Sequence, residues 1–274
     1  MQPYLIRNYY LCLSMKKVAI IAFSITAILL LCLAFTHKKE KPNADSNTHQ
    51  TQLGQGFALI ELYTSEGCSS CPPAEKFMDK LMQKAEGLPV YVLEFHVDYW
   101  DYLGWKDSLA KPEYSKRQQD YLGHFYLSSM YTPQAIVNGE SEMLGSDESK
   151  VNAVMQKELL LPASVSITCT AHKTGDSKIE VDYSLPKPMP GNLLNCVLVE
   201  SDLTTHINKG ENEGKTLTHD NAVRVFESIK AESASGKISL DASHVNLAHA
   251  RVICYLQNTS NFKIIAAGQV ASIQ

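Results

Sequence analysis

Hydrophobic and polar residues form three successive patterns along the chain. The first is an unbroken apolar run from Val18 to Phe35. From Phe57 to about Leu160, strand-like apolar runs alternate with segments whose apolar residues recur at helical spacing. After Pro162 the apolar residues recur at every second position, which is typical of strands that bury one face. The pattern predicts a targeting segment, an α/β domain and an all-β domain.

The pattern of residues 57–161 predicts that this segment forms the α/β domain. A strand at Phe57–Tyr63 leads through a polar turn to a helix, and Asn138-Gly139 is a strong hairpin signal. The order strand, helix, strand, helix, hairpin, helix predicts a central mixed sheet flanked by helices. The first helix is predicted to start near Ser69 to Cys71, because Pro72 and Pro73 fit a first helical turn, and its apolar face begins at Ala74. The later elements are predicted at 90–97, 112–123, 134–137, 142–144 and 147–160.

Residues 162–274 predict an antiparallel, sandwich-like domain, because short strand-like runs alternate with turn signals. Its long polar loop, Gly210–Arg224, is unusual. The polar residues in and near this loop are His206, Glu211, Glu213, His219 and Asp220. Their spacing matches no defined metal site. We therefore expect a structural loop, or an interface with the first domain.

The N-terminal segment, residues 1–36, is predicted to be a signal peptide or a signal anchor. Its apolar run follows Lys16-Lys17 and is just long enough to span a bilayer. Residues 37–56 are polar and predict a flexible linker. We expect export to the periplasm or cell envelope. If the segment is not cleaved, residues 18–35 would anchor the protein in the membrane.

Composition adds two constraints. The 274-residue chain has a net charge of -4, which gives no reason to expect nucleic-acid binding. It has seven cysteines, of which Cys68, Cys71, Cys169, Cys196 and Cys254 follow the linker. An odd number in this part leaves at least one thiol unpaired. Cys196 and Cys254 are candidates for a disulfide across strands, with Cys169 as a buried thiol.

The strongest chemical signal is Cys68-Ser69-Ser70-Cys71, placed where a strand ends and a helix begins. The positive end of a helix dipole favours a thiolate, and cysteines in such positions have pKa values of about 3.5 to 7.5. We predict a redox-active disulfide in which Cys68, the more exposed residue, attacks and Cys71 resolves. A structural disulfide and half of a zinc site are the alternatives.

The order of elements and Tyr131-Thr132-Pro133 resemble the thioredoxin superfamily. The resemblance implies that the Thr132–Pro133 bond is cis and that Pro133 lies against Cys68. It also implies that the backbone at Thr132 pairs with a bound substrate chain. The Ser-Ser pair differs from the Gly-Pro of thioredoxins, and a tryptophan before Cys68 is missing. The redox potential is therefore open.

Three stretches are also similar to an uncharacterised, exported thioredoxin-like family classed as a domain of unknown function. They are Glu61–Ala74, Phe95–Trp105 and Gly210–Asn221. This similarity extends through most of the chain after the linker. The family has no established reaction, so the resemblance implies a fold but no substrate.

Residues near the end of the second predicted strand are further candidates for the site. His96, Asp98 and Trp100 should lie at the same sheet edge as the cysteines. Asp98 is a candidate for orienting His96 or taking a proton, and Trp100 for contacting substrate. Glu61 is a candidate proton acceptor, because thioredoxins bury an acid near the resolving cysteine. Packing over the core edge is the alternative role for these side chains.

The sequence favours an exported thiol–disulfide oxidoreductase that acts on disulfides or thiols of proteins or small molecules. It needs no cofactor. One alternative is a copper(I)-handling protein in which Cys68, Cys71 and His96 hold the metal, since soft thiolates suit copper(I). Another is a non-catalytic interaction protein of the cell envelope with a structural disulfide.

Overall fold

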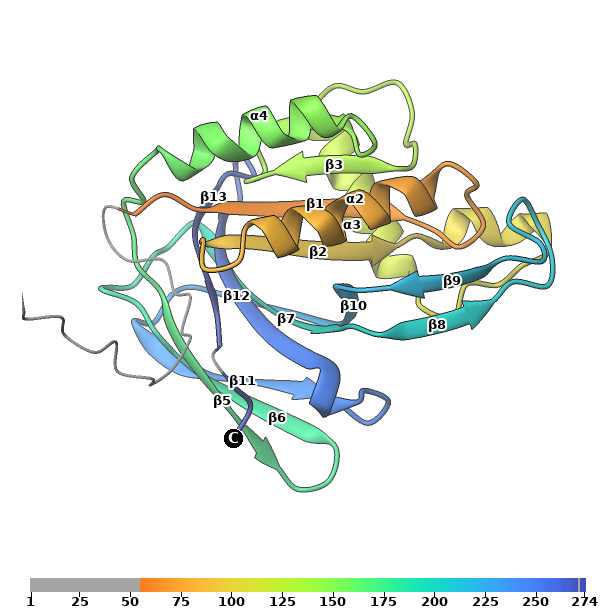
Figure 1. The fold of residues 1–274 in the computed structure, drawn as a ribbon. Coiled ribbons are helices and arrows are strands. Elements are labelled where there is room, and N and C mark those ends of the chain that lie inside the picture. Colours follow the sequence, from red (N-terminus) through yellow and green to blue (C-terminus); the bar gives the residue numbers. More distant parts are fainter. Residues whose placement is uncertain (1–54, 271) are drawn as a thin grey trace, which may run out of the picture. The chain divides into compact units, whose positions relative to one another are not determined.

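One mixed sheet of eight strands runs through most of the described chain (Figure 1). The structure is a computed structural model, and it describes residues 55–270 and 272–274. The predicted targeting segment and nearly all of the predicted linker lie outside these residues. Within the described ranges, no helix has both the length and the apolar character that a membrane span requires.

The first half of the described chain follows the predicted order of elements. The first helix begins at Cys71, within the start predicted near Ser69 to Cys71, because Pro72 and Pro73 fit a first helical turn whose N–H groups need no helical acceptor. The elements are β1 (Ala58–Thr64), α2 (Cys71–Lys84), β2 (Val90–His96), η1 (Asp98–Leu103), α3 (Pro112–His124), β3 (Gln134–Val137), β4 (Ser141–Leu144) and α4 (Glu148–Leu159).

Helices cover both faces of this part of the sheet. Side chains alternate along β1, which is buried throughout, so Ile60 and Leu62 pack against α2 and α4. Leu59 and Tyr63 point to the other face and pack against α3. The strand order β2-β1-β3-β4, with β1 and β2 parallel and β3 antiparallel to β1, makes the sheet mixed. The mixed α/β architecture predicted from the sequence is confirmed.

The second half of the chain extends the same sheet. β10 joins β2 in parallel at Ala222 and Glu94, and β7, β12 and β13 continue outward from β10. The predicted boundary at residue 161 therefore separates strands that share one sheet, and the described residues all belong to one compact unit. The strands involved are β7 (Asn192–Glu200), β10 (Ala222–Lys230), β12 (Ala250–Asn258) and β13 (Ile264–Gln269).

A three-stranded antiparallel sheet packs over this extension. It consists of β5 (Thr168–Thr174), β6 (Lys178–Ser184) and β11 (Ser235–Asp241). Its inward residues, including Ile179 and Val181, share a core with Leu198 of β7 and Val252 of β12. A short 3-10 turn, η2 (Leu247–His249), precedes β12. The period-two pattern of this segment therefore corresponds to two sheets packed face to face.

The predicted polar loop at Gly210–Arg224 contains more regular structure than expected. β8 (Leu203–His206) and β9 (Thr216–His219) form a separate two-stranded hairpin. Residues 207–215 connect these strands and are called the covering loop below. In β9, Leu217 and His219 are buried and the residues beside them are exposed. The polar stretch therefore contained the alternation of buried and exposed residues that is typical of a strand.

Candidate functional site

The cysteine turn joins β1 to α2. Cys68 and Cys71 form a disulfide with their Cα atoms 5.4 Å apart, and Cys71 is the first residue of α2. Both cysteines are 0% exposed, so the expectation that Cys68 is the more exposed residue is wrong. Ser69 and Ser70 between them are exposed, and Ser70 Oγ lies 3.4 Å from Cys68 Sγ. A reagent that attacks either sulfur therefore requires part of the surrounding structure to move.

Trp100 links the cysteine turn to the cis proline. The Thr132–Pro133 peptide bond is cis, as the sequence predicts. Trp100 Nε1 donates a hydrogen bond to Thr132 Oγ1 at 2.8 Å. A Cβ atom added to Gly67 would lie 2.9 Å from Trp100 Cβ, so Trp100 packs through its Cβ atom directly on the residue before Cys68. The tryptophan thereby holds two predicted parts of the site together.

The covering loop closes over the cysteine turn. Asn212 is 0% exposed, and its Nδ2 donates to the carbonyl oxygens of Glu66 at 2.9 Å and Cys68 at 3.0 Å. The backbone N–H of Ser69 donates to Glu211 Oε2 at 3.0 Å. These contacts make the loop an interface with the first part of the chain, one of the two roles predicted for it. The loop therefore lies against the turn in which both cysteines are buried.

A buried cluster of charged side chains lies beside the turn. His219 Nδ1 is 2.8 Å from Glu75 Oε2, and His219 Nε2 is 3.2 Å from Glu66 Oε1. Burial alone disfavours a charged imidazole, but the two carboxylates outweigh it and raise the pKa of His219 to about 11. Burial also opposes ionisation of Glu75, yet His219 lowers the pKa of that carboxyl. Sequence spacing missed this cluster because its members come from the turn, α2 and β9.

Asp107, not Asp98, orients His96. His96 Nδ1 lies 2.7 Å from Asp107 Oδ2, and both side chains are fully buried. Burial opposes ionisation of Asp107, but His96 and backbone N–H groups hold the pKa of its carboxyl below the usual range. Asp98 instead accepts from Ser115 at the start of α3. The expectation that Asp98 orients His96 is therefore wrong, since η1 turns the Asp98 side chain toward α3.

The edges of this cluster contain further acids and a tryptophan. Trp105 Nε1 donates to Glu66 Oε2 at 2.7 Å, so both tryptophans of the chain contact the cysteine turn. Glu94 is fully buried, and burial followed by repulsion from Glu75 raises the pKa of its carboxyl well above the usual range. Glu75 had a sequence signal that was overlooked: it is an acid on the apolar face of α2, next to Ala74 and Met78.

Comparison with known proteins places the chain in a family. A family model described as "Protein of unknown function (DUF1223)" matches residues 59–257. The chain belongs to this family. A search of curated proteins found no match. Membership of this family does not indicate a reaction or a substrate.

Two solved structures resemble this DUF1223 protein. The crystal structure of protein AGR_C_4864 from Agrobacterium tumefaciens is 27% identical, with a TM-score of 0.57, and the match covers 79% of this chain and 95% of that one. A domain of the outer membrane lipoprotein Omp28 from Porphyromonas gingivalis is 12% identical, with a TM-score of 0.26, over 40% of this chain and 89% of that one. The Agrobacterium structure therefore supports the described fold.

Glu61 of the DUF1223 protein lies on the face of the sheet opposite α2. Arg117 of α3 donates to both of its carboxylate oxygens at 2.7 Å, and Tyr63 and Tyr121 also donate to it. Side chains alternate between the two faces of β1, and Thr64 contacts Glu75 of α2. Glu61 is three residues before Thr64, so its side chain points to the other face. Glu61 is therefore a buried ion-pair partner, and the expectation that it lies near Cys71 is wrong.

The remaining cysteines cluster in the core of the second half. Cys196 and Cys254 are directly opposite each other on β7 and β12, and both are reduced. Cys169 of β5 is also reduced and reaches Cys254 across the packed sheets. Burial raises the pKa of the Cys196 and Cys254 thiols. The structure therefore shows three inert thiols where a Cys196–Cys254 disulfide was a candidate.

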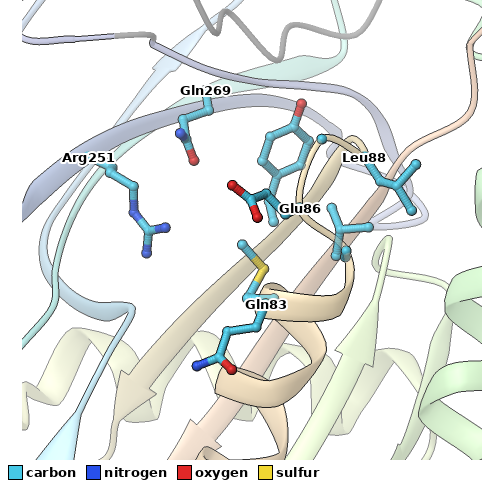
Figure 2. Close-up of a pocket in the computed structure, with 10 residues that line it drawn as sticks. Gln83, Glu86, Leu88, Arg251 and Gln269 are labelled. Carbon is cyan, nitrogen blue, oxygen red and sulfur yellow. The ribbon is translucent and has the colours of Figure 1, made fainter.

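Two hollows flank α2. Figure 2 shows one of about 440 Å³ at the C-terminal end of the helix, where Gln83, Glu86 and Leu88 lie across from Arg251 and Gln269. This hollow is at the end of α2 opposite the cysteines. A groove of about 470 Å³ lies between α2 and β9, and its lining includes Pro72, which follows Cys71. The groove is therefore the hollow adjacent to the disulfide.

Proposed function

We propose that this protein is an exported thiol–disulfide oxidoreductase of the cell envelope with a thioredoxin-like first half. The observation that carries the proposal is the Cys68–Cys71 disulfide at the junction of β1 and α2. The strand order β2-β1-β3-β4 and the cis bond before Pro133 support the thioredoxin-like assignment. Export rests on the apolar run from Val18 to Phe35.

The proposed reaction is a two-electron exchange. A substrate thiolate attacks Cys68 Sγ, which breaks the Cys68–Cys71 bond and forms a mixed disulfide on Cys68. Cys71 leaves as a thiolate at the start of α2, where the helix dipole stabilises the negative charge. A second substrate thiolate then attacks the substrate sulfur and releases Cys68. The substrate becomes a disulfide, the protein a dithiol, and the reverse sequence reduces a substrate disulfide.

Residues around the disulfide have roles in this scheme. The backbone at Thr132 pairs with the substrate chain, and Trp100 positions Thr132 through its indole N–H. The groove between α2 and β9 accommodates the substrate next to Cys71. Since both sulfurs are buried, the covering loop opens before substrate reaches Cys68. The protein would therefore exchange disulfides slowly until a partner displaces this loop.

The burial of both cysteines also favours a second function. A disulfide that is 0% exposed and covered by Asn212 also fits a non-catalytic envelope protein with a structural disulfide. The two functions differ in reduction potential. Catalytic pairs lie between about -270 mV and about -120 mV, whereas structural disulfides lie below about -300 mV.

The deciding experiment is a redox titration of the full chain in glutathione and dithiothreitol buffers. The reduced fraction of Cys68 is measured by alkylation and peptide mass spectrometry. We expect a midpoint between about -270 mV and about -120 mV. A midpoint below about -300 mV would contradict the oxidoreductase and support the structural disulfide. Cys71→Ser should in addition trap substrate on Cys68, and Cys68→Ser should not.

A further inference from the structure

Two buried histidines near the cysteine turn share an unusual arrangement. The Nδ1 atom of His96 contacts Asp107, and the Nδ1 atom of His219 contacts Glu75. Among the described residues, neither Nε2 atom has a hydrogen-bond partner, although both side chains are 0% exposed. A histidine that binds a metal usually has one ring nitrogen held by a carboxylate and the other free to coordinate. His96 has this form, and His219 lies between two carboxylates, with Glu75 at Nδ1 and Glu66 at Nε2.

A third buried atom without a hydrogen bond belongs to the same cluster. Glu66 Oε1 lies 3.2 Å from His219 Nε2, but the pair lacks hydrogen-bond geometry in the described part of the chain. His96, His219 and Glu75 each offer a ligand atom within 4.8 Å of the others. The rings of His96 and His219 meet edge to face, with centroids 4.9 Å apart. Unsatisfied buried polar atoms that converge in this way indicate a missing partner.

Charge balance points to a cation as that partner. Glu66, Glu75 and Asp107 bring three carboxylates into a buried space that offers two imidazoles as counter-charges. A proton on His219 would pair it with Glu66 and Glu75, but would leave the Nε2 atom of His96 without a partner. A metal ion shared by His96 Nε2, His219 and Glu75 gives His96 a partner and leaves the Nε2–H group of His219 to donate to Glu66.

We propose that His96, His219 and Glu75 bind one divalent transition-metal ion. Two imidazole nitrogens and a carboxylate suit zinc, which takes such ligands at about 2.0–2.2 Å and can hold a water molecule in its fourth position. Asp107 and Glu66 are positioning residues that hold the rings of His96 and His219. Ligand spacing along the chain gave no sign of this site, because the ligands come from α2, β2 and β9.

A second cluster in the described chain makes a useful contrast. His172, Glu180 and Asp182 also place ligand atoms within 4.8 Å of one another. These side chains are partly exposed, and Lys237 already pairs with both acids. The cation of a lysine occupies the position that a metal would need. His172 therefore provides a matched control for the buried histidines.

The buried site would fasten the covering loop over the disulfide. Glu66 precedes Cys68 in the turn, Glu75 follows Cys71 by one helical turn, and His219 belongs to the strand that ends the covering loop. One ion bound by Glu75 and His219, with Glu66 held against His219, ties the loop to the two segments that carry the cysteines. This inference stands apart from the proposed oxidoreductase activity, because a structural disulfide would need the same fastening.

Zinc content tests the site directly. The untagged full chain is kept oxidised, stripped with a chelator, incubated with Zn²⁺ alone, dialysed and analysed by mass spectrometry of the metal. We expect about one zinc per chain in wild type and in His172→Gln, and more than about 10-fold weaker zinc affinity in His96→Gln and His219→Gln. Asp107→Asn should weaken the affinity by roughly 10- to 100-fold.

Measurements on the wild type alone keep the test decisive if a variant fails to fold. Co²⁺ in place of zinc should give the intense visible absorption of a four-coordinate site, and zinc should raise the Tm. Wild type that retains no zinc overturns the proposal and leaves a proton on His219. Zinc retained fully by folded His96→Gln also overturns it. Because the cysteines stay oxidised throughout, these results do not depend on disulfide exchange.

Discussion

Asn212→Ala should speed the reduction of the Cys68–Cys71 disulfide. A thiol must reach one of the two sulfurs, and both are fully buried under the covering loop. The amide of Asn212 makes two hydrogen bonds to the cysteine turn, at 2.9 Å and 3.0 Å. Truncation to alanine removes both, so the loop should open more often while the rest of the fold stays closed.

The size of the effect follows from these two bonds. Each intramolecular hydrogen bond contributes about 1 kcal/mol to stability, so opening becomes easier by about 2 kcal/mol. A factor of ten corresponds to about 1.4 kcal/mol, which gives a rate increase of roughly 30-fold. The carbonyl oxygens freed in the closed state are buried, and their desolvation would increase the effect further.

The assay is a time course with excess dithiothreitol. Samples are quenched with an alkylating reagent, and the labelled fraction of Cys68 is measured by peptide mass spectrometry. Asn152→Ala is the matched control, because Asn152 also donates to a backbone carbonyl, that of Glu148, but on the exposed surface of α4. Urea unfolding of both variants separates local opening from global destabilisation.

Either of two results would refute the reasoning. If Asn212→Ala is reduced within about two-fold of the wild-type rate, the covering loop does not control access to the disulfide. An equal acceleration in Asn152→Ala would likewise show that the effect is not local to the turn.

Three other predictions concern the core of the protein. Arg117→Met should lower the free energy of unfolding by about 3–5 kcal/mol, since it leaves Glu61 buried and unpaired, and adding Glu61→Met should restore part of the loss in urea unfolding. Gly67→Ala should destabilise by about 1–3 kcal/mol and shift the tryptophan fluorescence, because the new Cβ would lie 2.9 Å from Trp100 Cβ; unchanged fluorescence would contradict this packing. Alkylation of the native protein should leave the three core thiols unlabelled, whereas urea should expose them, and rapid native labelling would disprove their burial. These thiols are Cys169, Cys196 and Cys254.

Local chemistry determined much of this protein. The alternation of apolar residues predicted the strands on both sides of the sheet, and the helical spacing after Ala74 predicted α2. Cys68 and Cys71 were placed at a strand-to-helix junction, and Thr132-Pro133 was predicted as a cis bond. These features depend on residues close in sequence, so a single chain is enough to identify them.

Tertiary structure alone decided the surroundings of the cysteines. The direction of Glu61 depends on the face of β1 that α3 covers, and the partner of His96 is Asp107 because the chain after η1 folds back beside β2. The hydrogen bond to the Cys68 carbonyl comes from Asn212, which is distant in sequence. Such contacts depend on which elements pack together, and spacing along the chain does not encode that. The buried cluster around His219 is therefore visible only in the folded protein, where the cysteine turn, α2, β2 and β9 lie together.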